Sequence, residues 1–385
     1  DEIEIEYALP LHVPMVDVRT IGAGGGSIAR VNEAGLLEVG PQSAGADPGP
    51  ICYGRGGDLP TISDANMVLG RLDVGKLKSV PGAVDIDDIR GIFQTRLGDP
   101  LGVDAETAAA AVLRMATTRM AGATRMVSVS LGLDPRDFSL FAFGGAGPLH
   151  ASALAGELGV PEVLVPARPG ITNALGCIVA DLRHDFVRTV NTPLDGMEID
   201  RLAGMMAAQA GEGEALIRQE PVRIEAIEVT HSLDMQFVGQ THLLSVPLAS
   251  AMMTRADIQN AFEEVYFNRF RVRLPDIRAQ IVNVNTSVTG RRPEVDLGGL
   301  IDNSARAGSV AAAQTGSRPV WFDGDGSASG WQDTPVYARE KLPLDARLNG
   351  PAILEQMDTT ILIEPQDSAV SDDDGNILVT VGGLS

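Results

Sequence analysis

Basic residues, aromatic residues and cysteines are all scarce in this sequence. Thirty Lys and Arg residues stand against 51 Asp and Glu residues, which gives a formal net charge of -21 at pH 7. Nucleic-acid binding needs clustered basic residues that neutralise phosphates, and the sequence has no basic stripe, so we expect no nucleic-acid partner. The acidic charge is explained more simply as a solubility feature than as a sign of a cationic partner.

The two cysteines, Cys52 and Cys177, lie far apart, and neither belongs to a CxxC motif. The sequence therefore supports neither a disulfide framework nor a cysteine zinc site, and we expect two buried thiols. Five scattered histidines give no ligand set, so we expect no metal site. No apolar run is long enough to span a membrane and no signal peptide opens the sequence, which predicts a cytoplasmic protein without a membrane partner.

A chain of 385 residues is long enough for two domains. Strands alternate with helices through tight glycine-proline turns up to about residue 190, which predicts an α/β domain over residues 1–190. Residues 191–385 read as a separate α+β domain that is rich in strands after residue 318. Within it, strict alternation over residues 277–290 predicts a strand, and the low-complexity segment 304–317 predicts a flexible connection.

The segment FSLFAFGGAGPLH, residues 138–150, contains the clearest candidate for a binding site. It predicts a buried strand over 138–143, a turn of Gly144, Gly145, Ala146 and Gly147, and a helix from Pro148. Glycines let the backbone approach a ligand closely, and the free N–H groups of the helix attract an anion or a sugar. The alternative is a merely structural turn. His150 follows it closely enough to meet a ligand, although such a histidine is more often structural.

A second glycine-rich segment, Gly24, Gly25, Gly26 and Ser27, precedes a predicted hairpin of strands 28–31 and 35–39. A dinucleotide fingerprint needs glycine at its sixth position and a helix after it. This segment has Ser27 at that position and strand-like residues after it. A nicotinamide dehydrogenase is therefore a weak interpretation.

A loop free of regular structure is predicted over residues 41–57, PQSAGADPGPICYGRGG. Loops of this length inside a compact domain are usually functional or mobile, and a surface Ω-loop is the alternative. Asp47 and Arg55 are among its polar anchors. A helix follows, with Ser63 or Asp64 as the expected N-cap, and Asp64 is either that cap or an active-site residue.

Six long segments together resemble the hydantoinase A and 5-oxoprolinase family. They are DVRTIGAGGGSIARV (17–31), VGPQSAGADPGPICYGRGG (39–57), PTISDANMVLGRL (60–72), FAFGGAGPLHASALAGELG (141–159), DMQFVGQTHLLSVP (234–247) and GPAILEQMDTTILIEP (350–365). The resemblance implies an actin-like, sugar-kinase-like ATPase fold whose lobes clamp ATP with Mg²⁺. The family's shared chemistry is phosphorylation of an amide or carbonyl oxygen, which prepares a cyclic amide for hydrolysis or a ketone for carboxylation.

The resemblance also implies roles for particular residues. The turn of Gly144, Gly145, Ala146 and Gly147 matches the family's adenosine-binding turn. The loop of Gly24, Gly25, Gly26 and Ser27 matches a second signature near the nucleotide or the interdomain cleft. Four residues match motifs of unassigned role and are the candidate catalytic residues; they are Asp47, Arg55, Asp64 and Asn66.

The sequence departs from the family pattern in one respect. The family's two phosphate loops, which hold the β- and γ-phosphates and position Mg²⁺, do not occur here. The first hypothesis is therefore that this chain is the C-terminal part of an ATP-dependent hydantoinase, oxoprolinase or ketone carboxylase. It would work with an N-terminal part carrying those loops and a hydantoinase B-like subunit, in which a zinc or manganese ion is possible. The alternative is a non-catalytic nucleotide-binding or assembly subunit, and the sequence leaves the choice among cyclic amides and ketones open.

Overall fold

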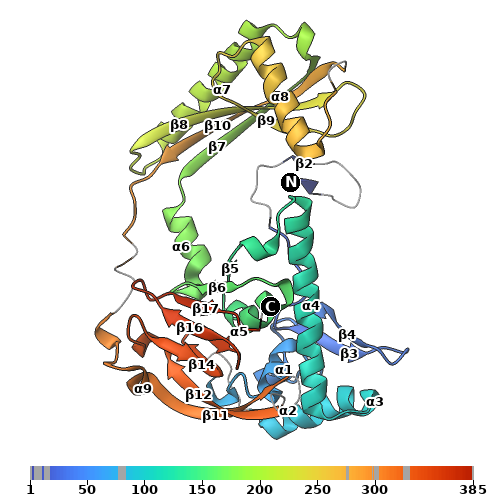
Figure 1. Ribbon diagram of the computed structural model, residues 1–385, viewed down its shortest axis with the longest axis vertical. Helices are drawn as coiled ribbons and strands as arrows, with labels where there is room; N and C mark the ends of the chain where they lie inside the picture. Colours follow the sequence, from blue (N-terminus) through green and yellow to red (C-terminus); the bar gives the residue numbers. More distant parts are fainter. Residues whose placement is uncertain are drawn as a thin grey trace. The chain divides into compact units, whose positions relative to one another are not determined.

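The computed structural model describes residues 2–3, 11–12, 18–76, 84–274, 277–296, 298, 303–323 and 330–383 (Figure 1). The chain forms two compact units, each built from two separate stretches. The larger unit comprises Val18–Ala174 and Leu297–Ser385, and the smaller unit comprises Asp1–Asp17 and Leu175–Asp296. The sequence predicted consecutive domains, 1–190 and 191–385. The division differs because the C-terminal strands pair with a strand from the first half of the chain.

That pairing occurs in a five-stranded sheet of the larger unit, ordered β13-β16-β17-β6-β5. Strand β17 lies antiparallel to β6, with Val379 opposite Val163, and β6 lies parallel to β5. The strands are β5 (Leu140–Phe141), β6 (Glu162–Val165), β13 (Arg347–Asn349), β16 (Ser368–Ser371) and β17 (Ile377–Thr380). The sheet therefore joins elements that are more than two hundred residues apart in the printed sequence.

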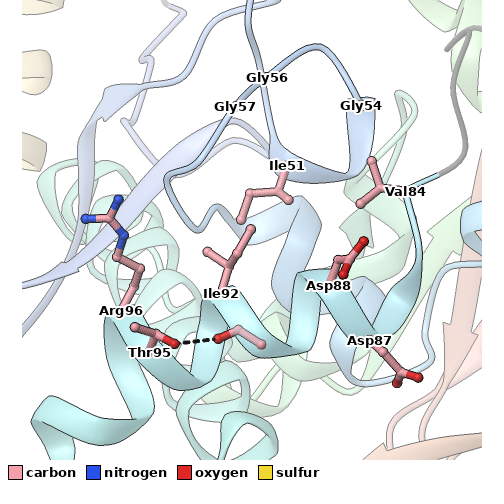
Figure 2. A pocket seen from close by; sticks show the side chains of 11 residues that line it. Ile51, Gly54, Gly56, Gly57, Val84, Asp87, Asp88, Ile92, Thr95 and Arg96 are labelled. Carbon is pink, nitrogen blue, oxygen red and sulfur yellow. Dashed lines mark hydrogen bonds between the residues drawn. The ribbon is translucent and has the colours of Figure 1, made fainter.

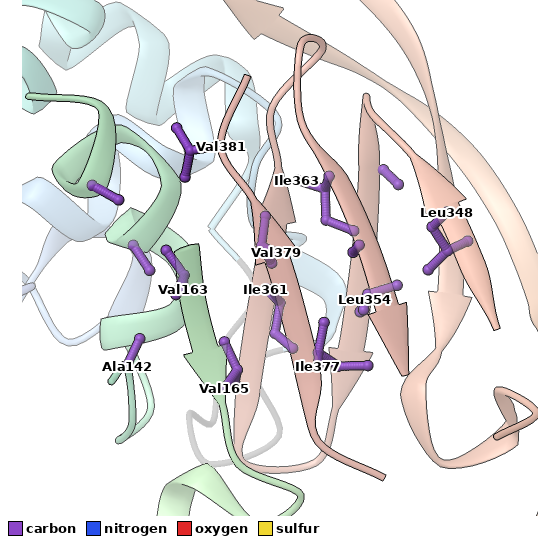
Figure 3. Close-up of a cluster of buried hydrophobic side chains, with 14 of the residues drawn as sticks. Ala142, Val163, Val165, Leu348, Leu354, Ile361, Ile363, Ile377, Val379 and Val381 are labelled. Atoms are coloured by element: carbon purple, nitrogen blue, oxygen red, sulfur yellow. The ribbon is translucent and has the colours of Figure 1, made fainter. Parts of the chain in front are cut away.

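A second sheet of the larger unit is ordered β11-β12-β14-β15. Its strands are β11 (Gln314–Phe322), β12 (Gly330–Ala338), β14 (Ala352–Gln356) and β15 (Thr359–Ile363). Val163 and Val379 of the first sheet share a buried apolar cluster with Leu354 and Ile361 of the second (Figure 3). Burying these aliphatic side chains from both sheets stabilises the unit, at about 1.5–3 kcal/mol for each fully buried side chain.

The prediction of a flexible connection over residues 304–317 is wrong. The structure has two short helices, η8 (Asn303–Ala305) and α9 (Val310–Ala313), and then the start of β11 in this segment. Ser309 caps α9 by accepting a hydrogen bond from Ala312 N, and Ala313 is fully buried. Ala313 is the one buried residue of this segment, and most of the others are exposed, so low sequence complexity here accompanies regular structure at the surface.

The remainder of the larger unit is mainly helical. It contains a hairpin, β3 (Ser27–Val31) and β4 (Leu37–Ser43), and the helices α1 (Ile62–Val68), α2 (Ile86–Phe93), α3 (Asp99–Leu101), α4 (Ala105–Ser130) and α5 (Gly147–Leu158). The predicted hairpin is confirmed. Helix α4 begins where the Asp104 side chain accepts a hydrogen bond from Thr107 N, and its alanines favour the helix. Ala108, Val112 and Ala116 bury one face of it.

Among its described residues, the smaller unit contains a four-stranded antiparallel sheet, ordered β7-β10-β8-β9, two long helices and a separate antiparallel pair, β1 and β2. Its elements are β1 (Glu2–Ile3), β2 (Leu11–His12), β7 (Leu182–Pro193), α7 (Ile199–Gln219), β8 (Ala226–Phe237), β9 (Leu244–Leu248), α8 (Arg255–Phe270) and β10 (Ala279–Arg291). The alternation that predicted a strand over 277–290 is confirmed by β10. Met206 of α7 and Phe262 of α8 share one buried cluster with Phe237, so both helices cover the same face of the sheet (Figure 1).

Short helical turns complete both units. They are η1 (Ile51–Tyr53), η2 (Val74–Lys76), η3 (Gln94–Gly98), η4 (Pro135–Asp137), η5 (Pro169–Ile171), α6 (Thr172–Val179), η6 (Leu194–Gly196) and η10 (Arg339–Lys341). Across the described ranges, no helix has the length and apolar character that a membrane span requires.

The two cysteines differ in exposure. Helix α6 buries none of its residues, and Cys177 in it is exposed, so the prediction of a second buried thiol is wrong. Cys52 is buried as predicted.

Candidate functional site

Two glycine-rich segments that lie far apart in the sequence line one cavity of the larger unit. The cavity has a volume of about 290 Å³. One wall contains Ala23, Gly24 and Gly25, and the other contains the end of β5 and the start of α5. Small-molecule pockets have volumes of about 300–1,000 Å³, so this cavity suits a group the size of a nucleoside.

The turn between β5 and α5 is held from outside by backbone and side-chain hydrogen bonds. Gly144 N donates to Pro169 O at 2.8 Å, and its φ of 83° is one that glycine adopts without strain. Thr359 Oγ1 donates to the carbonyl oxygens of Gly144 and Gly145, both at 3.2 Å. These contacts fix the path of the turn, so the cavity wall does not depend on a bound ligand.

Helix α5 starts at the cavity, and among the N–H groups of its first residues Leu149 N donates to Ala146 O at 3.1 Å while Pro148 has none, which leaves Gly147 N. Its N-cap residue, Ala146, makes no side-chain cap hydrogen bond, and Pro148 occupies the first turn. The first N–H groups of a helix carry a partial positive charge and donate hydrogen bonds to hydroxyl or anionic oxygens. Gly147 lines the cavity, and an added Cβ there would meet no atom within 4 Å, so backbone borders open space.

Gly24, Gly25 and Gly26, in the other glycine-rich segment, have different structural roles. An added Cβ at Gly24 would meet nothing within 4 Å, whereas one at Gly25 would lie 2.6 Å from Ser63 Oγ and one at Gly26 would lie 2.9 Å from Ser43 Oγ. Gly24 therefore leaves the cavity open, and Gly25 and Gly26 permit close packing behind it. Of the eight predicted cofactor-binding residues, the cavity is lined by Gly24, Gly25, Ala146 and Gly147; the others are Gly26, Ser27, Gly144 and Gly145.

Two phenylalanine rings on the cavity wall are exposed, whereas the sequence predicted that their strand is buried. The sequence predicted a buried strand over residues 138–143, but β5 spans only Leu140–Phe141 at the edge of its sheet. Phe141 and Phe143 are 46% and 39% exposed, and their ring centroids are 5.4 Å apart. The signal in the sequence was two phenylalanines at alternate positions beside a glycine turn. Exposed rings of this kind offer a stacking surface to a planar base.

His150 is the one titratable side chain among the described residues that line the cavity. Burial and, secondarily, the positive charge of Arg71 lower its pKa from 6.5 to about 4, so its imidazole is neutral at pH 7. The Nε2 atom lies 3.5 Å from Asn66 Nδ2, which also donates to Ile62 O at 2.9 Å. If the amide donates to Nε2, the imidazole proton resides on Nδ1.

Asn66, one of the candidate catalytic residues, is 1% exposed. Its Oδ1 atom has no hydrogen-bond partner within the part of the chain that the structure describes. Behind it, Arg71 lies 3.9 Å from Glu364, and burial raises the pKa of Glu364 although Arg71 acts in the opposite direction. The structure thus brings Asn66 to the cavity only through His150.

Asp64 is buried and fully engaged at the start of α1. Its carboxylate accepts hydrogen bonds from Cys52 N at 2.8 Å, Ile51 N at 3.2 Å and Thr61 N at 3.0 Å. Thr61 is the N-cap, rather than the predicted Ser63 or Asp64, and Asp64 completes the capping box. Burial, and then the charge of Asp64, raise the pKa of the Cys52 thiol. Asp64 therefore anchors the preceding loop to the helix.

Asp47 and Arg55 are exposed on that loop, away from the cavity lining. Arg55 Nη1 donates to Ala46 O at 2.9 Å. The end of the loop and helix α2 instead border a separate open pocket of about 760 Å³ (Figure 2). Two of its charged lining residues are engaged locally, since Arg96 pairs with Asp58 at 2.9 Å and Asp87 pairs with Arg90 at 2.8 Å.

Two family models match the chain. One, described as hydantoinase/oxoprolinase, matches residues 2–186, and the other, described as the hydantoinase/oxoprolinase C-terminal domain, matches residues 211–378. The chain belongs to the hydantoinase/oxoprolinase family. The family resemblance inferred from the sequence motifs is confirmed.

Individual members of this family match over nearly the whole chain. The alpha subunit of caprolactamase from Pseudomonas jessenii is 34% identical over 361 residues, which are 92% of this chain and 51% of the relative. The gamma subunit of acetophenone carboxylase from Aromatoleum aromaticum is 29% identical over 377 residues, which are 92% of this chain and 50% of the relative. The chain spans about half the length of these relatives.

A solved structure of the family has the same architecture. The crystal structure of ATP-dependent caprolactamase from Pseudomonas jessenii aligns with a TM-score of 0.81 and 32% identity, over 97% of this chain and 54% of that chain. The mixed α/β fold predicted from the sequence is therefore the fold of the hydantoinase/oxoprolinase family.

Proposed function

We propose that this chain contributes the adenosine-binding part of an ATP-dependent enzyme that activates an amide or carbonyl oxygen by phosphorylation. The observation that carries the proposal is the single cavity lined by both glycine-rich segments, two exposed phenylalanine rings and the start of α5. The rings would stack on a purine, and the backbone N–H of Gly147 would bind a ribose oxygen. The match to an ATP-dependent caprolactamase supports the nucleotide.

The chain would supply nucleotide binding, and the phosphates and Mg²⁺ would be held elsewhere in the assembly. Among the described residues, no group of three or more His, Cys, Asp or Glu side chains could hold a metal ion. We propose that the phosphate loops come from another segment or polypeptide. Two relatives are named as subunits, which supports partner subunits for this chain. We propose that a hydantoinase B-like subunit is one of them.

Phosphorylation makes the substrate's amide or carbonyl oxygen part of a phosphate, which is a good leaving group. Water would then add to the carbon of the phosphorylated cyclic amide, the ring C–N bond would break with protonation of the nitrogen, and a second water would hydrolyse the resulting acyl phosphate to a carboxylate and inorganic phosphate. A ketone would be phosphorylated as its enol, whose carbon would form a bond to carbon dioxide while water cleaves the O–P bond and releases inorganic phosphate. The part that we assign to this chain is positional: it holds the nucleotide by the adenosine so that the reacting groups meet elsewhere. Substrates in the range of lactams, hydantoins, 5-oxoproline and ketones are all compatible with this role.

The binding step is tested by valine substitutions at glycines whose Cβ position is open. Gly24→Val and Gly147→Val place a side chain at the cavity without a clash, so the fold should persist. We expect ATP to bind the purified assembly at least about tenfold more weakly, which corresponds to about 1.4 kcal/mol. Gly156→Val, elsewhere on α5 and also open, is the control. Isothermal titration calorimetry with unchanged affinity in both cavity variants would contradict the proposal.

A second candidate function is a nucleotide-binding or assembly subunit without catalysis. It is favoured by the cavity lining, in which His150 is the one titratable side chain among the described residues. Turnover separates the two functions. If the assembly binds ATP but converts no lactam, hydantoin, 5-oxoproline or ketone in an ATP-stimulated manner, the assembly role replaces the enzymatic one.

A further inference from the structure

Asn66 and His150 lie side by side at the cavity of the two glycine-rich segments. His150 lines the cavity, and its Nε2 atom lies 3.5 Å from Asn66 Nδ2. Both side chains are deeply buried, since Asn66 is 1% exposed and His150 is 9% exposed. An inference about what this pair does to a ligand rests on the proposed function, because the pair borders the same cavity.

The orientation of the Asn66 amide is set by a third group. Asn66 Nδ2 also donates to Ile62 O at 2.9 Å. If the amide were turned over, Asn66 Oδ1 would face that carbonyl oxygen, and two acceptors would meet. The amide therefore presents an N–H to His150 Nε2, although Asn66 Oδ1 has no partner among the described residues.

This orientation determines which nitrogen of His150 carries the proton. An N–H group faces Nε2, so Nε2 is the accepting nitrogen of a neutral imidazole and the proton resides on Nδ1. Burial and the positive charge of Arg71 lower the pKa of His150 to about 4, which keeps the imidazole neutral at pH 7. A protonated imidazole would place a second donor against Asn66 Nδ2.

The Nδ1 atom is the part of His150 that remains for a ligand. It makes no hydrogen bond with the described residues, and it is not one of the buried side-chain atoms that lack a partner. Because His150 lines the cavity, we place Nδ1 at the cavity. The same lining contains Phe141 and Phe143, whose exposed rings suit a planar base. A base stacked on such a ring keeps its edge free for hydrogen bonds.

We propose that His150 Nδ1–H donates a hydrogen bond to a ring nitrogen of the bound purine, and that Asn66 is the positioning residue that holds this proton on Nδ1. The ring nitrogens N1, N3 and N7 of adenine are acceptors, so a fixed donor binds one of them and disfavours a C–H group in the same place. His150 therefore contributes to base specificity, whereas stacking on the phenylalanine rings suits any base. Asn66 acts on the ligand only through His150.

Three analogues of ATP test the hydrogen bond in the wild-type assembly. In 1-deaza-ATP, 3-deaza-ATP and 7-deaza-ATP, a C–H group replaces one ring nitrogen. We expect at least one analogue to bind about five- to tenfold more weakly than ATP in isothermal titration calorimetry, because it loses one neutral hydrogen bond. This difference should vanish in His150→Phe. His242→Phe, at an exposed histidine, should keep it and is the matched control.

The outcomes separate this inference from the proposed function. If ATP and all three analogues bind equally well, or if the difference persists unchanged in His150→Phe, the hydrogen bond is overturned while nucleotide binding stands. If the assembly binds no ATP, the proposed function fails and the hydrogen bond fails with it.

The position of the proton is measured without nucleotide, so it does not depend on the proposed function. NMR of protein labelled with ¹⁵N in histidine distinguishes a protonated ring nitrogen from an unprotonated one, and His150→Phe identifies the signals of His150. We expect the proton on Nδ1 in the wild type. In Asn66→Asp, whose carboxylate accepts, Nε2 should carry a proton.

The wild-type spectrum gives an answer whether or not Asn66→Asp folds. A neutral His150 with its proton on Nε2 in the wild type would overturn the proposal. A folded Asn66→Asp in which Nε2 stays unprotonated would show that Asn66 does not set the position of the proton.

Discussion

His150 lines the cavity, and the lowering of its pKa to about 4 keeps its imidazole neutral at pH 7 and also in mild acid. A neutral imidazole can donate from one nitrogen and accept at the other. Beside a nucleotide, it would offer a hydrogen bond without adding a charge. Sequence analysis could place His150 near the glycine turn, but burial and the nearby Arg71 depend on segments that are distant in the sequence.

The lowered pKa of His150 predicts a loss of stability in acid. Between pH 6.5 and pH 4 the unfolded state binds a proton at His150 that the folded state does not bind. The contribution of neutral His150 to the free energy of unfolding is therefore complete above pH 6.5 and is lost as the pH falls towards 4. From pH 7 to pH 4.5, the free energy of unfolding should therefore fall by about 2–3 kcal/mol more in the wild type than in His150→Gln. Urea unfolding at both pH values measures this difference.

His242 provides the matched control, because it is exposed. His242→Gln should follow the wild-type pH dependence. If His150→Gln loses as much stability in acid as the wild type, His150 titrates as an exposed histidine and the description of the cavity is wrong.

At the scale of elements, the sequence predicted local structure better than it predicted pairing. The β3–β4 hairpin and strand β10 were predicted because the strand pattern that signals each of them is local in the sequence. The sequence identified the two glycine-rich segments as separate features, but it did not predict that they line one cavity. The partners of β6 could not be predicted, because periodicity shows that a segment is a strand but not which strand lies beside it.

The capping boxes of α1 and α8 allow a paired prediction. Thr61 with Asp64 and Thr254 with Asp257 have the same geometry, but Asp64 is 0% exposed and also holds two loop N–H groups, whereas Asp257 is exposed. Asp64→Asn should lower the free energy of unfolding by about 2–4 kcal/mol, because it replaces charge-assisted hydrogen bonds in a buried site. Asp257→Asn should cost about 1 kcal/mol or less.

Chemical denaturation of the two variants measures both effects. Equal costs would mean that the loop contacts of Asp64 contribute nothing to stability. The predicted catalytic role of Asp64 stays a prediction, and its two carboxylate oxygens already have partners in the loop and helix.

At the scale of the whole molecule, the two units have separate buried clusters. Phe93 belongs to the larger unit and Phe262 to the smaller one, and each is fully buried. No buried cluster of described residues contains side chains from both units. We therefore expect calorimetry to resolve two unfolding transitions.

Phenylalanine deletions should assign these transitions. Phe93→Ala and Phe262→Ala should each cost about 3–5 kcal/mol, and each should lower one transition while leaving the other unchanged. A single transition that both variants lower would show that the units unfold as one. The boundary near residue 190 was a natural prediction, because the change in sequence character there is real, but the return of the last strands to the larger unit has no local signal.

The central claim is that both glycine-rich segments bind one nucleotide, and photolabelling of the purified assembly with an azidoadenine analogue of ATP tests it most directly. The account predicts that the label attaches to peptides covering residues 23–25 or 140–154, that excess ATP prevents it, and that Gly147→Val removes it. Labelling confined to other peptides, unchanged by Gly147→Val, would contradict the account.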